Sequence, residues 1–241
     1  MRGAAYEDST HGITHFLKKR SETQVSNKTI LEMKHINKSF PGVRALQDVD
    51  FTLCGGEIHA LMGENGAGKS TLIKVLTGVY EKDDGQIFVE GNDKEVSIRS
   101  PQDAQRLGIS TVYQEITLCP NLSVAENMYI GRTENIYQDW KKMNADADKL
   151  LRSLDIPAKA TQQLAACSIA VQQMVAIARA VDMDCKVLIL DEPTAGLDPK
   201  GRDDILGLVQ KLHNEQGLTI ILVSHSMEDV ARYVSRLVVM N

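Results

Sequence analysis

The sequence predicts an α/β fold built around a parallel β-sheet, on the strength of two observations. Apolar runs of strand length alternate with helical patterns in the last third of the chain. A glycine-rich loop at residues 63–68 lies between a predicted strand and a predicted helix. Strands that alternate with helices form parallel sheets, which bind ligands at the carboxyl ends of their strands.

The first third of the chain is β-rich with one loop-to-helix unit. Short alternations of apolar and polar residues predict strands at Ile30–Phe40, Leu46–Leu53 and Glu57–Met62. A helix over Lys69–Leu76 follows the glycine-rich loop and is closed near Gly78. Turn signals on both sides of Gln86–Glu90 predict an arm of a β-hairpin.

The middle of the chain carries helical periodicity, and the last third returns to an α/β pattern. The predicted helices of the middle are Asn121–Ile130, Trp140–Leu154 and Val171–Val181. Lys186–Leu190 and Leu218–Val223 are continuous apolar runs, which is typical of buried parallel strands. Helices are predicted at Asp203–Leu212 and Met227–Val234, and a last strand begins at Leu237–Met240.

Composition excludes several classes of protein. The 241 residues are 43% hydrophobic and 24% charged, which is a globular balance. The formal net charge of −5 gives no basic field for nucleic acid, and we expect no nucleic-acid partner. No apolar stretch approaches the roughly 20 residues that span a bilayer, so any membrane role is expected to come through a partner. The four cysteines contain no CxxC pair that would predict a zinc or redox motif.

A phosphate-binding loop is the strongest motif in the chain. The eight residues Gly63-Glu64-Asn65-Gly66-Ala67-Gly68-Lys69-Ser70 fit the pattern G-x-x-x-x-G-K-[ST], between a strand and a helix. Glycines let backbone N–H groups turn inward around an anion, and the helix N-terminus adds its positive dipole end. Lys69 is predicted to reach the β- and γ-phosphates of a nucleotide, and Ser70 to bind Mg²⁺.

Two adjacent acids follow the apolar strand at 187–190. Asp191 at the end of this strand is predicted to lie beside the Mg²⁺ ion. Glu192 comes directly after it and is predicted to face the γ-phosphate, where a carboxylate can polarise an attacking water as a general base. Together with the phosphate loop, these acids predict a nucleotide-hydrolysing site.

With the segment Cys167–Gln173 before a helix and Pro193-Thr194 after the two acids, the chain resembles the ATPase domain of ABC transporters. The resemblance covers residues 30–241. It implies a P-loop NTPase fold with a RecA-like parallel sheet core, an N-terminal antiparallel β subdomain and an inserted helical subdomain at about 115–184. Residues 1–29 are expected to be a disordered extension.

The resemblance also implies roles for single residues. Phe40 falls where the family stacks an aromatic ring on adenine, and Thr71 completes the phosphate loop. Gln114 falls at the Q-loop, which touches Mg²⁺, and His225 falls at the histidine that contacts the γ-phosphate. Two further residues are expected to act across a dimer, Ser168 on the γ-phosphate of the opposite subunit and Asp198 in the D-loop.

From the family we expect ATP and Mg²⁺ as cofactors and a site shared between two ATPase domains. The expected partners are a second such domain, transmembrane permease subunits and, indirectly, a periplasmic or extracellular substrate-binding protein. The expected location is peripheral, on the cytoplasmic face of the cell membrane.

The signature segment departs from the family pattern Leu-Ser-Gly-Gly-Gln, because only the serine, Ser168, matches. Ile169 and Ala170 add Cβ atoms where close backbone approach is expected. The segment from Ser168 to Val181, like the phosphate loop, is similar to bacterial monosaccharide-importer ATPases. We therefore expect ATP hydrolysis that drives uptake of a sugar.

Two alternatives stay open. From about residue 195 the chain is more similar to ATPases of energy-coupling-factor importers of vitamins and metals. The ATPase of such an importer is therefore one alternative function, and the change of similarity along the chain suggests a hybrid. The degenerate signature favours a second reading, a regulatory half-site that binds nucleotide with little hydrolysis. The family continues beyond Val238–Asn241 with a glycine-containing hairpin, so we expect a truncated C-terminal end with an unpaired final strand.

Overall fold

The computed structural model describes residues 28–90, 92, 94–115, 117–132, 139–226, 230 and 232–240. Of the expected extension at 1–29, residues 1–27 lie outside these ranges, and Thr29 already belongs to the first strand. Half of the helix expected at Met227–Val234 lies outside them as well. In the described part, no helix is both long and apolar enough to cross a bilayer.

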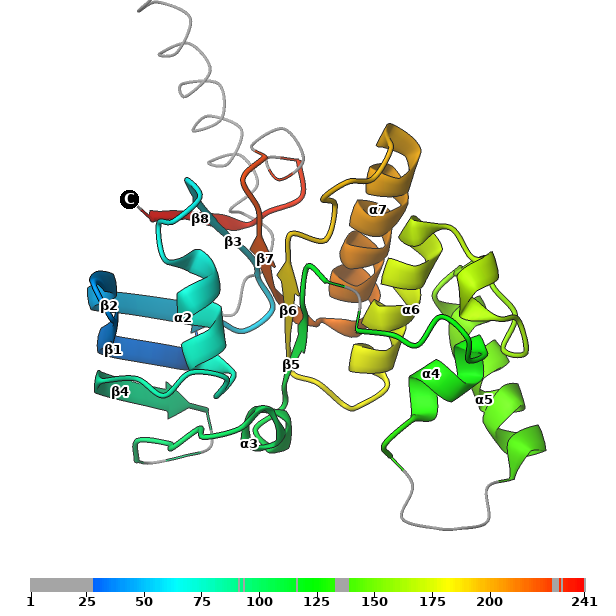
Figure 1. Ribbon diagram of the computed structural model, residues 1–241, viewed down its shortest axis with the longest axis horizontal. Coiled ribbons are helices and arrows are strands. Elements are labelled where there is room, and N and C mark those ends of the chain that lie inside the picture. The colour runs from blue at the N-terminus through cyan, green and yellow to red at the C-terminus, as the bar shows by residue number, and fades with distance from the viewer. Residues whose placement is uncertain are drawn as a thin grey trace, which may run out of the picture.

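A five-stranded parallel sheet forms the centre of the molecule (Figure 1). Its strand order is β5-β6-β7-β3-β8, and every neighbouring pair is parallel. The strands are β3 (Ile58–Gly63), β5 (Ile109–Val112), β6 (Val187–Asp191), β7 (Thr219–Val223) and β8 (Arg236–Met240). This sheet confirms the fold class that the alternation of strands and helices predicts.

A three-stranded antiparallel sheet packs beside α2 and the parallel sheet (Figure 1). Its order is β2-β1-β4, with β1 (Thr29–Phe40), β2 (Val43–Cys54) and β4 (Asp84–Val89). The prediction of a hairpin arm at Gln86–Glu90 is therefore wrong in its pairing. This segment forms β4, which pairs with β1 more than forty residues earlier rather than with a strand next to it in sequence.

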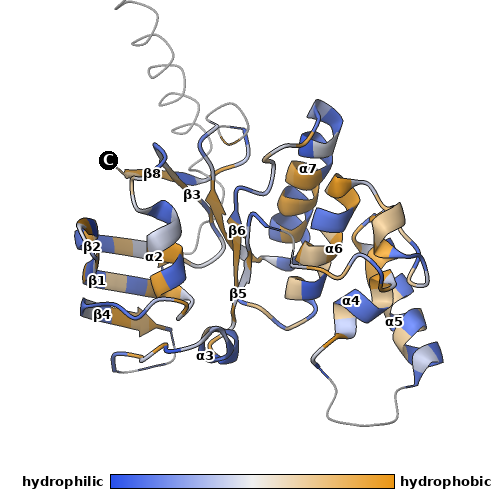
Figure 2. Ribbon diagram, viewed as in Figure 1, coloured by the Kyte–Doolittle hydropathy of each residue, from blue (hydrophilic) through white to orange (hydrophobic). Residues whose placement is uncertain are grey.

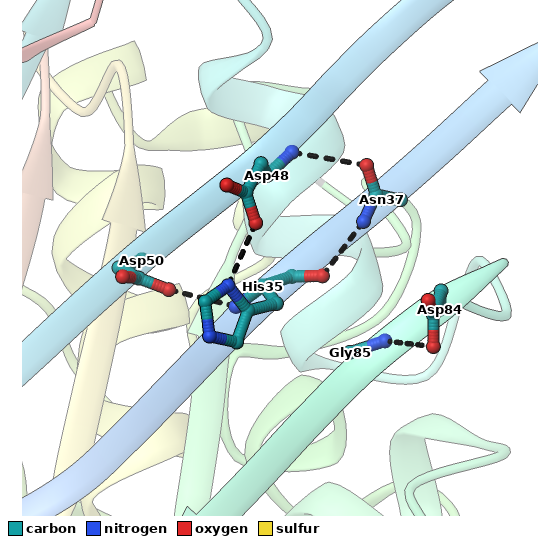
Figure 3. A network of polar contacts seen from close by, with 6 residues as sticks. All are labelled: His35, Asn37, Asp48, Asp50, Asp84 and Gly85. Atoms are coloured by element: carbon teal, nitrogen blue, oxygen red, sulfur yellow. Dashed lines mark hydrogen bonds and ion pairs between the residues drawn. The ribbon is translucent and has the colours of Figure 1, made fainter.

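The pairing of β1 with β2 contains register shifts around Ile36, and a network of polar contacts lies beside them (Figure 3). His35 and Asp48 both adopt positive φ, and the His35 ring contacts the Asp48 carboxylate at 2.7 Å. The Asp50 carboxylate accepts from the His35 backbone N–H at 2.7 Å. Asn37 links the two strands, because its amide donates to the His35 carbonyl and accepts from the Asp48 N–H. The bond between imidazole and carboxylate raises the pKa of His35.

Helices cover both faces of the parallel sheet. The helices are α2 (Lys69–Leu76), α3 (Pro101–Arg106), α4 (Val124–Tyr129), α5 (Trp140–Ser153), α6 (Ile169–Val181) and α7 (Pro199–Gln216), with a short 3₁₀ helix η1 (Leu164–Ala166). Helices α4 to α7 gather on one side, while α2 lies between the two sheets (Figure 1). The strands of the central sheet are the most continuously hydrophobic elements (Figure 2).

Alternate side chains of each central strand feed two separate cores. In β6, Leu188 and Leu190 pack with helices α4 to α7, whereas Val187 and Ile189 pack with α2 and the antiparallel sheet. Successive side chains of a strand point to opposite faces, so a strand between two cores must be apolar at every position. This requirement explains the continuous apolar runs at β6 and β7.

The last described strand, β8, is paired on one side, so the expectation of an unpaired final strand is wrong for that side. Within the described residues β8 is still the edge strand of the parallel sheet, as the expected exposed edge requires. β8 pairs with β3 along its length, from His59 opposite Arg236 to Gly63 opposite Met240. Its backbone therefore runs directly beside the strand that leads into the phosphate loop.

Candidate nucleotide site

The phosphate loop joins β3 to α2 through glycines with left-handed backbone. Gly63, Gly66 and Gly68 have φ of +148°, +92° and +91°, a region that side chains disfavour. At two of these glycines, a neighbouring backbone atom also lies too close to leave room for a side chain. A Cβ on Gly63 would lie 2.4 Å from the Met240 carbonyl oxygen, and a Cβ on Gly68 would lie 2.6 Å from the Ala45 carbonyl oxygen.

Lys69 holds its ammonium group within this loop. Its Nζ donates to the carbonyl oxygens of Gly63 at 2.7 Å and Glu64 at 2.9 Å, and the residue is 6% exposed. No side chain caps the N-terminus of α2, since the N-cap residue is Gly68. The first N–H groups of a helix have no partner within the helix, so this end offers donors and a positive dipole to an anion.

Asp191 ends β6 as a buried carboxylate with an incomplete set of partners. The residue is 6% exposed, and its Oδ1 has no hydrogen-bond partner in the described part of the chain. Burial, with the neighbouring Glu192 charge, raises the pKa of Asp191, and Lys74 and Lys69 oppose this shift. A buried carboxylate oxygen without a partner fits a divalent cation, because charge and coordination are then both satisfied.

The magnesium site expected from the sequence combines Asp191 with Ser70 and Gln114. Ser70 is exposed in the first turn of α2, and Gln114 is exposed just after β5. The described residues contain no group of three His, Cys, Asp or Glu side chains that could hold a metal alone. Magnesium commonly uses one or two carboxylates and completes its shell with phosphate oxygens and water. The residues present therefore suit a nucleotide-bound Mg²⁺ ion.

Glu192 and His225 form a pair at the carboxyl ends of β6 and β7. His225 Nδ1 lies 2.8 Å from Glu192 Oε2, and a neutral ring must carry its proton on Nδ1 to donate this bond. The Glu192 side chain is 11% exposed, whereas that of His225 is 61% exposed. The backbone of Glu192 adopts φ of +49°, and its N–H donates to the Val223 carbonyl oxygen at 2.9 Å. The pair holds the carboxylate in one orientation.

A cleft of about 440 Å³ brings together residues from four separate parts of the chain. Its volume lies within the range of small-molecule sites. The lining residues are Phe40, Val43, Ala45, Asn65, Gly66, Gly68, Lys69, Ser70, Thr71, Gln114 and Glu192. Of the other residues that the sequence singles out, Gly63, Glu64 and Ala67 belong to the loop itself, and Asp191 and His225 adjoin Glu192.

One end of the cleft is aromatic and aliphatic. Phe40 is half-buried and contacts Tyr80 edge-on, with ring centroids 5.1 Å apart. Lys38 Nζ lies 5.5 Å from the centroid of the Phe40 ring. Val43 is 62% exposed and pairs with Phe40 across the Pro41-Gly42 turn. Val43 and Ala45 belong to none of the sequence motifs. Proline followed by glycine is nevertheless a turn signal, and it predicts that Val43 lies opposite Phe40.

Ser168 and Asp198 do not line this cleft. Each is exposed and caps a helix: Ser168 Oγ accepts from the Val171 N–H at 3.3 Å, and Asp198 Oδ1 accepts from the Gly201 N–H at 3.0 Å. Both side chains therefore stabilise the start of a helix, α6 for Ser168 and α7 for Asp198. The exposed hydroxyl and carboxylate leave both residues available to another molecule.

The comparisons with known proteins place this geometry in a family. The sequence profile described as "ABC transporter" matches residues 46–195, which is more than half of the chain. The chain belongs to the ABC transporter family.

Two curated relatives and one solved structure are among the similar proteins. The galactofuranose transporter ATP-binding protein YtfR of Escherichia coli K12 is 45% identical over 220 residues, covering 90% of this chain and 43% of its own. The ribose import ATP-binding protein RbsA of Shouchella clausii is 43% identical over 215 residues, covering 88% and 42%. The ADP conformation of MJ1267, an ATP-binding cassette of an ABC transporter, is 28% identical with a TM-score of 0.79, covering 89% and 88%. The chain spans less than half the length of these curated relatives.

Proposed function

We propose that this chain is the ATP-binding subunit of an ABC transporter, which hydrolyses ATP to drive uptake of a monosaccharide through a separate membrane permease. The observation that carries the proposal is the cleft in which the phosphate loop, Gln114 and Glu192 converge beside Phe40. Sugar as the substrate class is supported by relatives whose names refer to import or transport of galactofuranose and ribose.

The binding roles follow from the donors present. The N–H groups at the start of α2, with Lys69, would bind the β- and γ-phosphates, and Phe40 would pack on the adenine ring. Ser70, Asp191 and Gln114 would hold Mg²⁺, which supplies neutralisation of phosphate charge when it is bound. The unpartnered Oδ1 of Asp191 supports this assignment.

The hydrolytic role falls to Glu192. Its carboxylate would accept a proton from the attacking water, and the bond from His225 Nδ1 orients it for that transfer. The solvent-exposed imidazole of His225 would contact the γ-phosphate. This division explains why a largely buried acid is paired with an exposed base.

A second ATPase domain is the partner that the site itself requires under this proposal. Ser168 and Asp198 are exposed helix caps outside the cleft, so they can complete a nucleotide site only on another domain. Permease subunits, an indirectly coupled substrate-binding protein and a location on the cytoplasmic face of the membrane complete the proposal.

A hydrolysis-poor regulatory half-site is a second candidate, which one observation favours. Ser168 Oγ already accepts a capping bond, and Ile169 beside it is 60% exposed where the family pattern has glycine. Import of a vitamin or metal by an energy-coupling-factor system is a third candidate, which rests on the similarity of the tail. The half-site differs from the sugar proposal in its rate of ATP hydrolysis, and the vitamin or metal importer differs in its transported substrate. Measuring ATP hydrolysis and substrate uptake therefore distinguishes the three candidates.

The test uses Glu192→Gln, which should keep nucleotide binding and slow hydrolysis. Light scattering with and without MgATP should show an ATP-dependent doubling of mass for Glu192→Gln. The unaltered chain and Glu215→Gln, a control that removes an exposed carboxylate of α7, should hydrolyse ATP at equal rates. Failure of the unaltered chain to bind ATP would refute the proposal, while binding without hydrolysis would favour the half-site.

The substrate class is tested in the cell. Deleting the gene for this chain should abolish uptake of a monosaccharide, whereas selective loss of vitamin or metal uptake would favour the third candidate.

A further inference from the structure

A hydrogen bond joins the helix of the phosphate loop to the segment that carries Gln114. Thr77 is the C-cap residue of α2, and its Oγ1 lies 3.0 Å from the hydroxyl of Tyr113. Tyr113 directly follows Val112, the last residue of β5, and directly precedes Gln114. Thr77 and Tyr113 are 36 positions apart, so the bond links two elements that chain connectivity leaves independent.

The direction of this bond follows from the available protons. A threonine hydroxyl has one proton, and Thr77 Oγ1 lies 2.9 Å from the Ile73 carbonyl oxygen, to which it can donate. The Tyr113 hydroxyl then donates to Thr77 Oγ1. In this arrangement each of the two hydroxyl protons makes one hydrogen bond. Thr77 is 2% exposed, so water competes poorly for this bond.

The position of Gln114 at the cleft depends on contacts made by the residues next to it. Its side chain makes no hydrogen bond within the described residues, and the residue is exposed at the cleft. The amide is therefore placed by its backbone, and the nearest side-chain bond that holds this backbone is the one from Tyr113. Tyr113 itself lines a groove different from the nucleotide cleft.

We propose that Tyr113, by donating to Thr77 at the end of α2, is a positioning residue that keeps Gln114 directed at the nucleotide cleft. The inference rests on the proposed function, since it gives Gln114 a part in holding nucleotide-bound Mg²⁺. Loss of the bond lets the segment move relative to the phosphate loop, and the contribution of Mg²⁺ to nucleotide affinity falls while affinity without Mg²⁺ stays the same.

The experiment measures the dissociation constant of a fluorescent ATP analogue, with Mg²⁺ and with a chelator. Tyr113→Phe and Thr77→Val each remove one hydroxyl with little change in shape. The ratio to compare is the dissociation constant with chelator divided by the dissociation constant with Mg²⁺. Each variant should reduce this ratio roughly threefold to tenfold, the range expected for one lost hydrogen bond. The double variant should lose no more than either single variant, because both remove the same bond.

Two controls separate positioning from a general effect on folding. Thr77→Ser keeps the hydroxyl and should retain the ratio of the unaltered chain. Thr111→Val removes a buried hydroxyl that has no hydrogen-bond partner among the described residues. Thr111 lies on β5, two residues before Tyr113, and this variant should also retain the ratio. An unchanged ratio in Tyr113→Phe or in Thr77→Val would overturn the inference. Absence of nucleotide binding by the unaltered chain would instead refute the proposed function.

Discussion

Two glycines of the phosphate loop allow the cost of close backbone approach to be measured separately from the cost of backbone strain. Gly66 and Gly68 have almost the same φ, +92° and +91°. A Cβ on Gly66 would meet no atom of the described residues within 4 Å. A Cβ on Gly68 would lie 2.6 Å from the Ala45 carbonyl oxygen and 3.0 Å from Leu46 Cδ2.

The expected magnitudes follow from this difference. Alanine at either position pays for positive φ, about 1–3 kcal/mol of folding free energy. The same substitution restricts the unfolded chain equally at both positions, so that contribution cancels in the comparison. Gly68→Ala must in addition move β2 away from the loop, and overpacking of this kind costs about 1–3 kcal/mol more. Gly68→Ala should therefore be the less stable variant by that second amount.

The assay is urea unfolding of both variants and the unaltered chain, without nucleotide. Equal slopes with different midpoints would show that only stability has changed. Midpoints that coincide for Gly66→Ala and Gly68→Ala would refute the reasoning, because the predicted clash would then have no energetic consequence.

Three further predictions concern single side chains. Ser168→Ala should destabilise the chain by about 1 kcal/mol in urea unfolding by removing the cap of α6, whereas Ser168→Asp should keep the cap; equal losses would contradict this. The pKa of Asp191 is raised by burial, so its ionised form costs stability above that pKa; Asp191→Asn should stabilise the nucleotide-free chain at pH 7, and the gain should shrink towards pH 4. A gain that does not depend on pH would exclude this cause. Burial raises the pKa of Cys185 to about 11, so alkylation followed by mass spectrometry should label exposed Cys119 first; early labelling of Cys185 would contradict its burial.

Local signals predict the phosphate-loop unit accurately. The helix expected at Lys69–Leu76 has these same bounds in the structure, because glycines mark both of its ends. The first helix of the last third begins at Pro199, four residues before the expected start, since Asp198 caps it and Pro199 suits its first turn. Aspartate followed by proline is a local signal for this start, whereas the apolar periodicity alone points to a later one.

Elements whose identity depends on distant neighbours are not predicted. Strand β5 has four residues, two of which are the polar Ser110 and Thr111, and it forms only through pairing with β6. Helix α3 has six residues, too few for a periodic pattern, although Ser100 and Pro101 supply an N-terminal signal. Short elements at the edge of a sheet carry little local information because their burial comes from the tertiary structure.

The candidate site divides in the same way. The phosphate loop and the two acids are contiguous motifs, so the sequence predicts them from their own residues. Phe40, Gln114 and His225 come from the family resemblance, because single residues of these types carry no pattern. The approach of Phe40 to Tyr80 and the bond between His225 and Glu192 depend on sheet pairing across many residues, and only the structure provides them. The catalytic, binding and dimer roles themselves stay predictions.

The left-handed backbone of Glu192 has a consequence for how this chain can change over evolution or by design. A non-glycine residue at positive φ costs stability, and asparagine or glycine would relieve that cost. Either replacement would also remove the carboxylate that His225 orients. Screening for heat resistance alone should therefore enrich substitutions at position 192, whereas screening for ATP turnover should reject them. In a library varied at position 192, chains with higher folding stability should lack ATP turnover, and chains that keep the glutamate should be less stable.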